Sequence, residues 1–213
     1  MDVVAILLAA GDSERMGTPK ALLPWRGQPL LSHQLQQIQK SRLDECIVVL
    51  GREADRLGPL VRPPLRPAWK SRAVYNPRHA EGKSASIRAG LTSLARRPDG
   101  ILIVAVDQPL DSRLLDALIA AAEEEWDRGA AVERRTIIVP SFHGRRGHPP
   151  LFCCSLFSEL IGVTEEGEGL KAVVRRDETR VRLLPWEDAA ILVNLNAPVD
   201  LPPPESRTSF KTH

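Results

Sequence analysis

The chain has 213 residues, a formal net charge of +2 at pH 7 and 43% hydrophobic residues. A chain of this length and apolar content can bury the core of one sizeable domain. The nearly balanced charge argues against a protein that binds nucleic acid through phosphate neutralisation. Three cysteines without a CxxC pair indicate a reduced, cytoplasmic protein. The first apolar run is too short for a membrane span, which needs about 20 residues.

Apolar runs alternate with helical patterns along the chain, which is typical of a mostly parallel sheet covered on both faces. The patterns predict strands at 3–9, 46–51, 73–76, 100–109, 136–142, 180–186 and 190–196. They predict helices at 30–41, 84–97, 112–129 and 169–177, and a short helix with a surface loop between 53 and 72. The expected fold is a three-layer α/β/α, Rossmann-like domain over residues 1–200, followed by a polar, proline-rich tail at 201–213.

The turn after the first strand reads "LAAGDSERMGTPK". The small residues Ala9, Ala10 and Gly11 leave the backbone N–H groups of this turn open to a ligand. Arg15 and Lys20 add a forked donor and a point cation, both suited to phosphates. The turn is neither a P-loop nor a GxGxxG loop. Two interpretations stay open here, a phosphate-binding loop and an ordinary charged turn.

Asp107 directly follows the apolar residues of the strand predicted at 100–109, in the segment "VAVDQPL". Ligands bind beyond the carboxyl ends of the strands in such sheets. Mg²⁺ prefers one or two carboxylates together with phosphate oxygens. The alternative, an N-cap for the next helix, suits Asp111 and Ser112 better because they are nearer to it. The position therefore favours a metal-binding role for Asp107.

Gly82, Ser84 and Ser86 surround the start of the predicted helix at 84–97. They are typical of a loop that binds a base, and Ser84 could also be only a helix cap. Asn194 and Asn196 alternate with apolar residues and would share one face of a strand end. Their amides suit a metal or a phosphate, or simply a polar strand edge.

A glycine-rich, basic segment, "FHGRRGHPPLF", contains Gly147 and His148. It is typical of a polar loop that binds an anionic acceptor, or of a surface loop. Cys153 and Cys154 follow it in an apolar context, which predicts core packing.

Together, these segments resemble the MobA-like nucleotidyltransferases, in particular the molybdenum cofactor cytidylyltransferases. "LAAGDSERMGTPK" is similar to the family fingerprint LAAGxSxRMGxxK, and "EGKSASIRAGL", "VDQP", "GRRGHPPLF" and "VNLNAPVD" follow in the family's order. The resemblance covers residues 3 to 200. It implies a nucleotide-diphosphosugar-transferase fold.

The resemblance also implies roles for individual residues. The backbone from Leu8 through Gly11 would hold the base and ribose, with Gly82 and Ser86 at the base. Arg15 and Lys20 would bind the triphosphate, and Asp107, with Asn196, would bind Mg²⁺. Gly147 and His148 would lie at the acceptor. The chain departs from the family at Asp12, at Ala197 and in lacking the usual final helix.

The implied activity is transfer of a nucleoside monophosphate, CMP in the first place, from the NTP to molybdopterin, with release of pyrophosphate. CTP and GTP both stay open as the donor. The product would pass to a molybdoenzyme or maturation factor. Alternatives are a nucleotidyltransferase acting on a sugar 1-phosphate or methylerythritol phosphate, and a noncatalytic accessory protein that binds nucleotide and cofactor. An oxidoreductase would need a fingerprint such as GxGxxG, which the sequence lacks.

Overall fold

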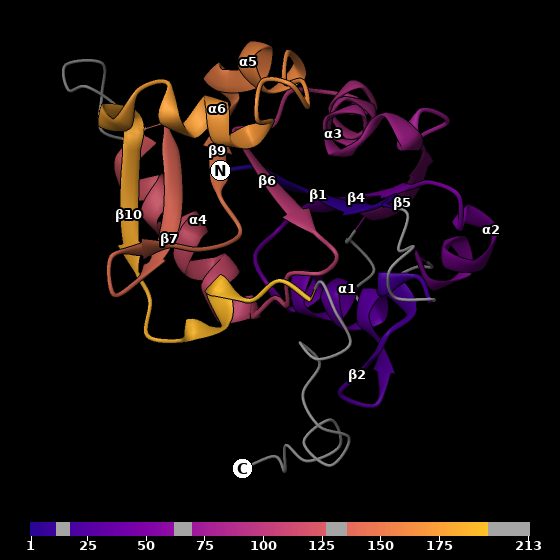
Figure 1. Cartoon of the computed structure of the whole chain (residues 1–213). Helices are drawn as coiled ribbons and strands as arrows, with labels where there is room; N and C mark the ends of the chain where they lie inside the picture. Colours follow the sequence, from indigo (N-terminus) through magenta and orange to yellow (C-terminus); the bar gives the residue numbers. More distant parts are fainter. Residues whose placement is uncertain (12–17, 62–69, 127–135, 196–213) are drawn as a thin grey trace.

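The computed structural model describes residues 1–11, 18–61, 70–126 and 136–195 (Figure 1). Several predicted features lie outside these ranges: Asp12, Arg15, Asn196, Ala197, and the tail at 201–213. Their predicted roles therefore stay predictions.

The described residues form an eight-stranded sheet whose main path runs in the order β10-β7-β9-β6-β1-β4-β5, with β8 paired to β7. Its strands are β1 (Val3–Ala9), β4 (Glu45–Leu50), β5 (Lys70–Tyr75), β6 (Gly100–Ala105), β7 (Ile137–Phe142), β8 (Arg145–Arg146), β9 (Leu151–Cys153) and β10 (Val181–Pro185). A separate hairpin joins β2 (Pro24–Trp25) to β3 (Gln28–Pro29). The pairs of β1 with β4 and β6, of β4 with β5, and of β7 with β10 are parallel. Antiparallel pairing is confined to β8 and β9 within this sheet, among the described residues.

The central strands of the sheet are buried on both faces. Every residue of β1 is buried, and its side chains alternate between two core clusters. Leu7 belongs to one cluster, and its neighbours Ile6 and Leu8 belong to the other. This explains why the sequence of β1 is a continuous apolar run rather than an alternating one.

Helices cover each face. On one face, the core contains Leu31 from α1 (Leu30–Lys40), Leu57 from α2 (Ala54–Leu57) and Leu115 from α4 (Ser112–Trp126). On the other face, it contains Ile87 from α3 (Lys83–Thr92), Leu160 from α5 (Phe157–Ile161) and Val173 from α6 (Leu170–Arg175). Figure 1 shows α3, α5 and α6 above the sheet and α1 and α4 below it. The predicted three-layer α/β/α, Rossmann-like fold is confirmed.

Short 3₁₀ helices connect these elements: η2 (Lys20–Leu22), η3 (Gly58–Val61), η4 (His79–Glu81), η5 (Cys154–Leu156), η6 (Glu178–Arg180) and η7 (Ala189–Leu192). The strand predicted at 190–196 is wrong as far as the structure describes it, because η7 lies there. The carboxylate of Asp188 accepts a hydrogen bond from the backbone N–H of Ala190 and so caps this turn.

The segment predicted as a polar loop partly forms strands. Positive φ angles at His143 and Gly144 make a tight turn that pairs β8 with β7. The next segment returns as β9 between β6 and β7. Cys153 and Cys154 there are only half-buried, so they contribute less to the core than their context predicts. None of the described helices is long and apolar enough to cross a membrane.

Candidate functional site

The first cavity lies at the carboxyl ends of β1, β4 and β6 and has a volume of about 350 Å³. Eight of the residues that the sequence singles out line it: Leu8, Ala9, Ala10, Gly11, Lys20, Gly82, Ser86 and Asp107. Residues far apart in the sequence are thus brought to one place, at the edge of the sheet where ligands bind in this class of fold.

Two glycines shape this cavity. A Cβ atom on Gly51 would lie 2.5 Å from the backbone oxygen of Ala10 and 2.9 Å from the Cβ of His79. Only glycine allows this approach, which holds the first loop against the turn after β5. A Cβ atom on Gly11 would meet no atom within 4 Å, so the space over Gly11 is open to a ligand. Gly51 was not identified from the sequence as a site residue.

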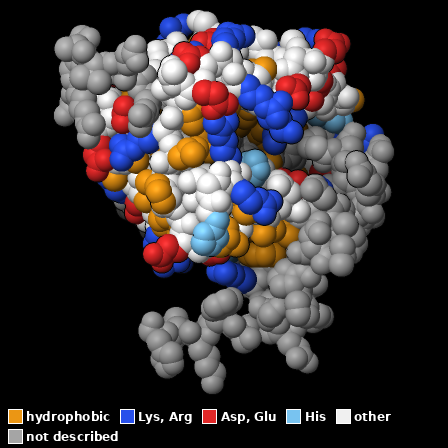
Figure 2. Space-filling model, turned by 60° about the vertical axis from the view of Figure 1, so that its left-hand side comes forward, with side chains coloured by type: hydrophobic (Ala, Val, Ile, Leu, Met, Phe, Trp, Pro, Cys, Tyr) orange, Lys and Arg blue, Asp and Glu red, His pale blue; other side chains and the backbone are white. Residues whose placement is uncertain are grey.

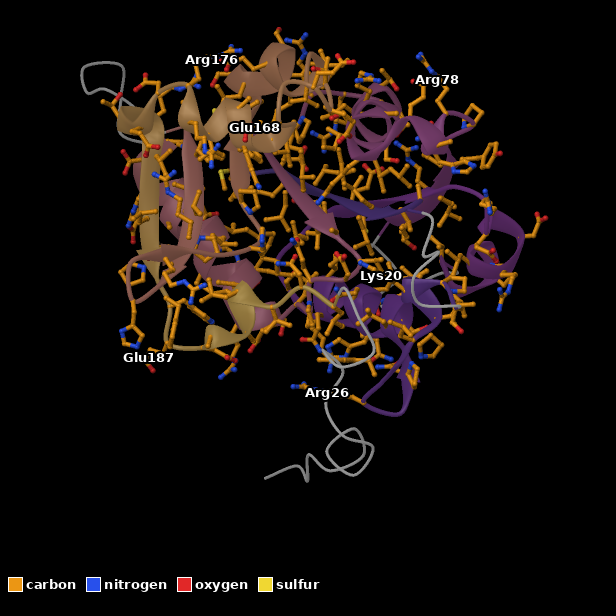
Figure 3. All side chains as sticks on the ribbon, in the orientation of Figure 1. Lys20, Arg26, Arg78, Glu168, Arg176 and Glu187 are labelled. Carbon is orange, nitrogen blue, oxygen red and sulfur yellow. The ribbon has the colours of Figure 1, made fainter. Side chains whose placement is uncertain are left out.

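Lys20 and Asp107 form an ion pair at this cavity. The Nζ of Lys20 lies 2.7 Å from the Oδ2 of Asp107, and their side chains are 22% and 19% exposed. Figure 3 shows Lys20 beside the carboxyl end of β6. The sequence predicted a phosphate ligand and a metal ligand separately, and the structure places the two groups in direct contact.

Gln34, on α1, holds the loop that carries Asp107. Its side chain is fully buried, and its Nε2 donates to the backbone oxygens of Val106 at 3.0 Å and Gln108 at 2.6 Å. Its Oε1 accepts from the backbone N–H of Leu110 at 2.9 Å. The available signal was a glutamine on the apolar face of a helix, beside Leu31 and Leu35, and it was overlooked.

Residues near Asp107 in the sequence make hydrogen bonds that do not involve its carboxylate. Asp111 accepts from the backbone N–H of Arg113 at 2.8 Å and caps α4, as expected. The hydrogen bonds of its carboxylate with Arg113 lower the pKa of Asp111.

The backbone oxygen of Asp107 accepts a hydrogen bond from the backbone N–H of Leu195 at 2.9 Å, which brings the chain before Asn196 to the site. Asn194 instead accepts from Gln108 at 2.8 Å.

Ser84 and Ser86, both near the start of α3, line different cavities. Ser86 is buried beside the first cavity and accepts from the Nδ2 of Asn76 at 3.1 Å. Ser84 borders a second cavity instead, so it does not share a wall with Gly82 and Ser86. Gly82, with φ +101°, takes the cap position of α3, and the interpretation of Ser84 as the cap is therefore wrong.

The second cavity measures about 470 Å³ and lies between α3, α6 and the β7–β9 region. Its apolar walls come from Ile87, Ile103, Val139, Leu170 and Val174. Its polar groups include Lys83, Ser84, Arg146, Gly147, His148, Glu165, Glu168, Lys171 and Arg175. Arg146 and Arg175 are each paired with a glutamate, Glu178 and Glu168 respectively. The cavity thus combines an apolar lining with both cationic and carboxylate groups.

Gly147 and His148, predicted at the acceptor, do line this second cavity. A Cβ atom on Gly147 would lie 2.6 Å from the Cγ1 of Ile191, so only glycine fits against η7. The backbone N–H of His148 donates to the oxygen of Ile191 at 2.9 Å. Burial lowers the pKa of the His148 imidazole, and the nearby Lys83 ammonium lowers it further. The imidazole is therefore neutral at physiological pH.

Lys83 is the one described residue that lines both cavities. The residue keeps much of its surface exposed to solvent, but the surrounding protein partly desolvates its ammonium, and this lowers the pKa of Lys83. The carboxylates of Asp107 and Glu165 oppose that shift. Lys83 was not identified from the sequence.

Among the residues that the structure describes, no three His, Cys, Asp or Glu side chains form a metal-binding cluster. The charges on the face shown in Figure 2 are mixed, with acidic, basic and histidine side chains lying beside hydrophobic ones.

Known proteins resemble the chain over most of its length. It is 29% identical over 203 residues to the purine catabolism protein PucB of Bacillus subtilis, covering 92% of each chain. It is 29% identical over 188 residues to nicotine blue oxidoreductase of Paenarthrobacter nicotinovorans, covering 87% of this chain and 88% of the relative.

Solved structures share the fold. The crystal structure of Rv0371c from Mycobacterium tuberculosis has a TM-score of 0.74 and 25% identity, covering 94% of this chain and 96% of the other. A complex of Rv0371c with manganese gives a TM-score of 0.71 at 23% identity, with the same coverage. The model of the MobA-like NTP transferase domain matches residues 5–181. The chain therefore belongs to the MobA-like NTP transferase family.

Proposed function

We propose that this protein is a metal-dependent nucleotidyltransferase that transfers CMP from CTP to molybdopterin and releases pyrophosphate. The observation that carries the proposal is the pair of Lys20 and Asp107, 2.7 Å apart, at the edge of the sheet between the small-residue loop and Lys83. Transfer of a charged phosphoryl group requires a residue that binds phosphate and a residue that binds a metal ion at the same place.

The first cavity is the proposed nucleotide site. The open backbone of 8–11 and the space over Gly11 suit a base and ribose, with Gly82 and Ser86 on the opposite wall. Lys20, and Arg15 from the loop outside the described residues, would bind the triphosphate. Because base recognition through backbone groups separates nucleotides poorly, GTP stays an alternative donor.

Asp107 is the proposed ligand of a divalent cation, Mg²⁺ in the first place. Its carboxylate already contacts a cation, the Lys20 ammonium, and so fits a positively charged partner. Asn196 would complete the protein's share, because it follows Leu195, which is bonded to the backbone of Asp107. Such a cation would neutralise charge on the phosphate oxygens. The manganese complex of Rv0371c, which has the same fold, is consistent with this assignment.

The second cavity is the proposed acceptor site. Its apolar walls suit a flat heterocycle, whereas a sugar would need more polar partners. Lys83, Lys171 and the neutral His148 supply donors for an anionic end. This combination favours a pterin phosphate over a sugar 1-phosphate or methylerythritol phosphate.

In the proposed reaction, a phosphate oxygen of the acceptor forms a bond to the α-phosphorus in line with the leaving group. The bond from the α-phosphorus to the bridging oxygen breaks, and pyrophosphate leaves with that electron pair. Lys20 offsets the negative charge that develops on the α-phosphate. Lys83, between the cavities, holds donor and acceptor phosphates close together. No covalent intermediate with the protein is needed.

The cellular setting follows from the same proposal. A nucleotide-bound form of molybdopterin has to be handed to a molybdoenzyme or its maturation factor. We place this handover in the cytoplasm, where the free thiols of Cys46, Cys153 and Cys154 would stay reduced. No role for nucleic acid or membrane is included.

The test is a transfer assay with mass detection. Purified protein, Mg²⁺ and molybdopterin are incubated with each of the four NTPs in turn, and both the nucleotidylated acceptor and pyrophosphate are quantified. The proposal expects equal amounts of the two products, with CTP as the best donor. If product forms only with a sugar 1-phosphate or methylerythritol phosphate, that compound would replace molybdopterin as the proposed acceptor. Nucleotide binding without transfer would favour the accessory protein.

A parallel arm follows NADH or NADPH oxidation, because one relative carries the name of an oxidoreductase. Consumption of the nicotinamide without transfer of a nucleotide would contradict the proposal. The Asp107→Asn variant serves as the negative control in the transfer arm.

A further inference from the structure

Glu165 lies at the N-terminus of α3, in the wall of the second cavity. Its Oε1 accepts a hydrogen bond from the backbone N–H of Ser84, in the first turn of the helix. Its side chain also lies over Gly82, where a Cβ atom would come within 2.6 Å of its Cγ. An anion is thus already bound at this helix end, and it belongs to the protein itself.

The groups around this carboxylate have donor capacity that Glu165 does not use. Ser84 lines the second cavity and is 2% exposed, and its Oγ has no hydrogen-bond partner among the described residues. Lys83 and Lys171 line the same cavity and make no ion pair within the described part of the chain. A buried hydroxyl and two lysines around one carboxylate therefore form a site that is only partly satisfied.

The segment that carries Glu165 is an exposed turn. The backbone N–H of Gly169 donates to the oxygen of Thr164 at 2.9 Å and closes this turn without using the Glu165 side chain. Glu165 is itself largely exposed and forms no ion pair within the residues described. Its carboxylate can therefore leave the helix end by a change of side-chain rotamer, while the turn stays folded.

We propose that the N-terminus of α3 is the binding site for the acceptor's phosphate, and that Glu165 occupies this site until the acceptor displaces it. A phosphate has more acceptor oxygens and more negative charge than a carboxylate. It could accept from both the backbone N–H and the hydroxyl of Ser84, and it would face Lys83 and Lys171. Glu165 would thus act as an internal competitor that weakens binding of the phosphate. This inference rests on the proposed function for the identity of the acceptor.

The test measures binding of inorganic phosphate by calorimetry. We expect Glu165→Gln to bind phosphate about tenfold more tightly than the wild type, because a neutral amide competes less well for the helix end. Glu166→Gln, which removes the same charge from the next residue, should bind like the wild type. Adding Ser84→Ala to Glu165→Gln should remove most of the gain.

Equal phosphate affinity in Glu165→Gln and the wild type would overturn the inference. A gain of the same size in Glu166→Gln would also overturn it, because the effect would then be general charge repulsion. Glu165→Ala provides a second variant if the glutamine variant folds poorly, and the same direction is expected.

This measurement separates the inference from the proposed function. Phosphate binding needs no transfer, so a tenfold gain stands as an anion site even if no acceptor is nucleotidylated. Transfer to molybdopterin with an unchanged acceptor KM and unchanged phosphate affinity in Glu165→Gln would leave the function intact and refute the role of Glu165.

Discussion

Lys20 and Asp107 are 87 residues apart in the sequence, yet the Nζ of one lies 2.7 Å from the Oδ2 of the other. Lys20 begins η2 and Asp107 follows the carboxyl end of β6, so the fold brings together charged groups from two distant segments of the chain. In the structure, each group neutralises the charge of the other. Under the proposed function, binding of a metal-nucleotide complex would separate them, with the ammonium facing phosphate and the carboxylate facing the cation.

Replacing Lys20 tests the phosphate role. Lys20→Ala should lower the turnover number by about 10² to 10³, the scale expected for the loss of one donor that acts in the transition state. Steady-state pyrophosphate release measures this. Lys40→Ala, at the exposed end of α1, is the matched control and should keep wild-type turnover. Full activity in Lys20→Ala would show that another group performs this role.

Replacing Gln34 tests how the loop of Asp107 is held. Gln34→Met leaves the backbone groups of Val106, Gln108 and Leu110 without their buried partner. The free energy of unfolding should fall by about 2–3 kcal/mol, and turnover should fall as Asp107 moves. Urea unfolding and the transfer assay measure the two effects. Gln36→Met, which breaks only the pair with Gln28, should change stability by less than about 1 kcal/mol.

Two glycine variants distinguish the packing role of Gly51 from the ligand-binding role proposed for Gly11. Gly51→Ala should lower the free energy of unfolding by about 1–3 kcal/mol, because its Cβ would meet the oxygen of Ala10 at 2.5 Å. Gly11→Ala should leave stability within about 0.5 kcal/mol. It should nevertheless weaken nucleotide binding, because the new methyl group points into the open space. Unchanged nucleotide affinity in Gly11→Ala would place the nucleotide elsewhere.

Replacing Lys83 and replacing Lys171, the two lysines that line the second cavity, should have different effects on the KM values. Lys83→Met should raise the KM of both nucleotide and acceptor by about tenfold, since Lys83 lines both cavities. Lys171→Met should raise the KM of the acceptor alone. Initial rates with each substrate varied in turn give both values. The idea of a bridging cation fails if Lys83→Met alters one KM only.

His33 predicts a dependence of stability on pH. It is 4% exposed, and burial, followed by the charge of Arg26, lowers the pKa of its imidazole from 6.5 to about 4. Between pH 6.5 and about pH 4, His33 takes up a proton in the unfolded chain but not in the folded protein. The free energy of unfolding therefore falls as the pH falls through this range. Near pH 4.5 this loss should reach about 2 kcal/mol relative to pH 7.

His33→Gln provides the comparison, because it keeps a polar group but cannot take up the proton. Its free energy of unfolding, measured with urea at several pH values, should decline less steeply than that of the wild type over the same range. Parallel curves for the two proteins would mean that His33 keeps a normal pKa.

The sheet was predictable because its strands are fully buried. Apolar runs such as 3–9 and 100–106 can be recognised without knowledge of their partner strands. Asp107 stands out because it directly follows such a run, and Lys20 because it ends the turn after the first strand. The strand predicted at 190–196 failed because alternation of polar and apolar residues cannot reveal the local cap supplied by Asp188.

Other parts of the site depend on tertiary contacts. Gln34 and Gly51 act on loops that are distant in the sequence, and nothing in their own neighbourhood indicates those partners. The two sides of α3 were also hidden, because spacing alone cannot tell which cavity Ser84 and Ser86 face. Arg15 and Asn196, which lie outside the described residues, stay predictions from the sequence.

The most direct test of the proposed reaction is a single-turnover measurement with CTP, Mg²⁺ and molybdopterin, followed by mass spectrometry of the acceptor. We predict that the acceptor gains one CMP for each pyrophosphate released, and that Asp107→Asn abolishes both products while still folding. Pyrophosphate release without a nucleotidylated acceptor, or undiminished transfer by Asp107→Asn, would contradict the proposed reaction.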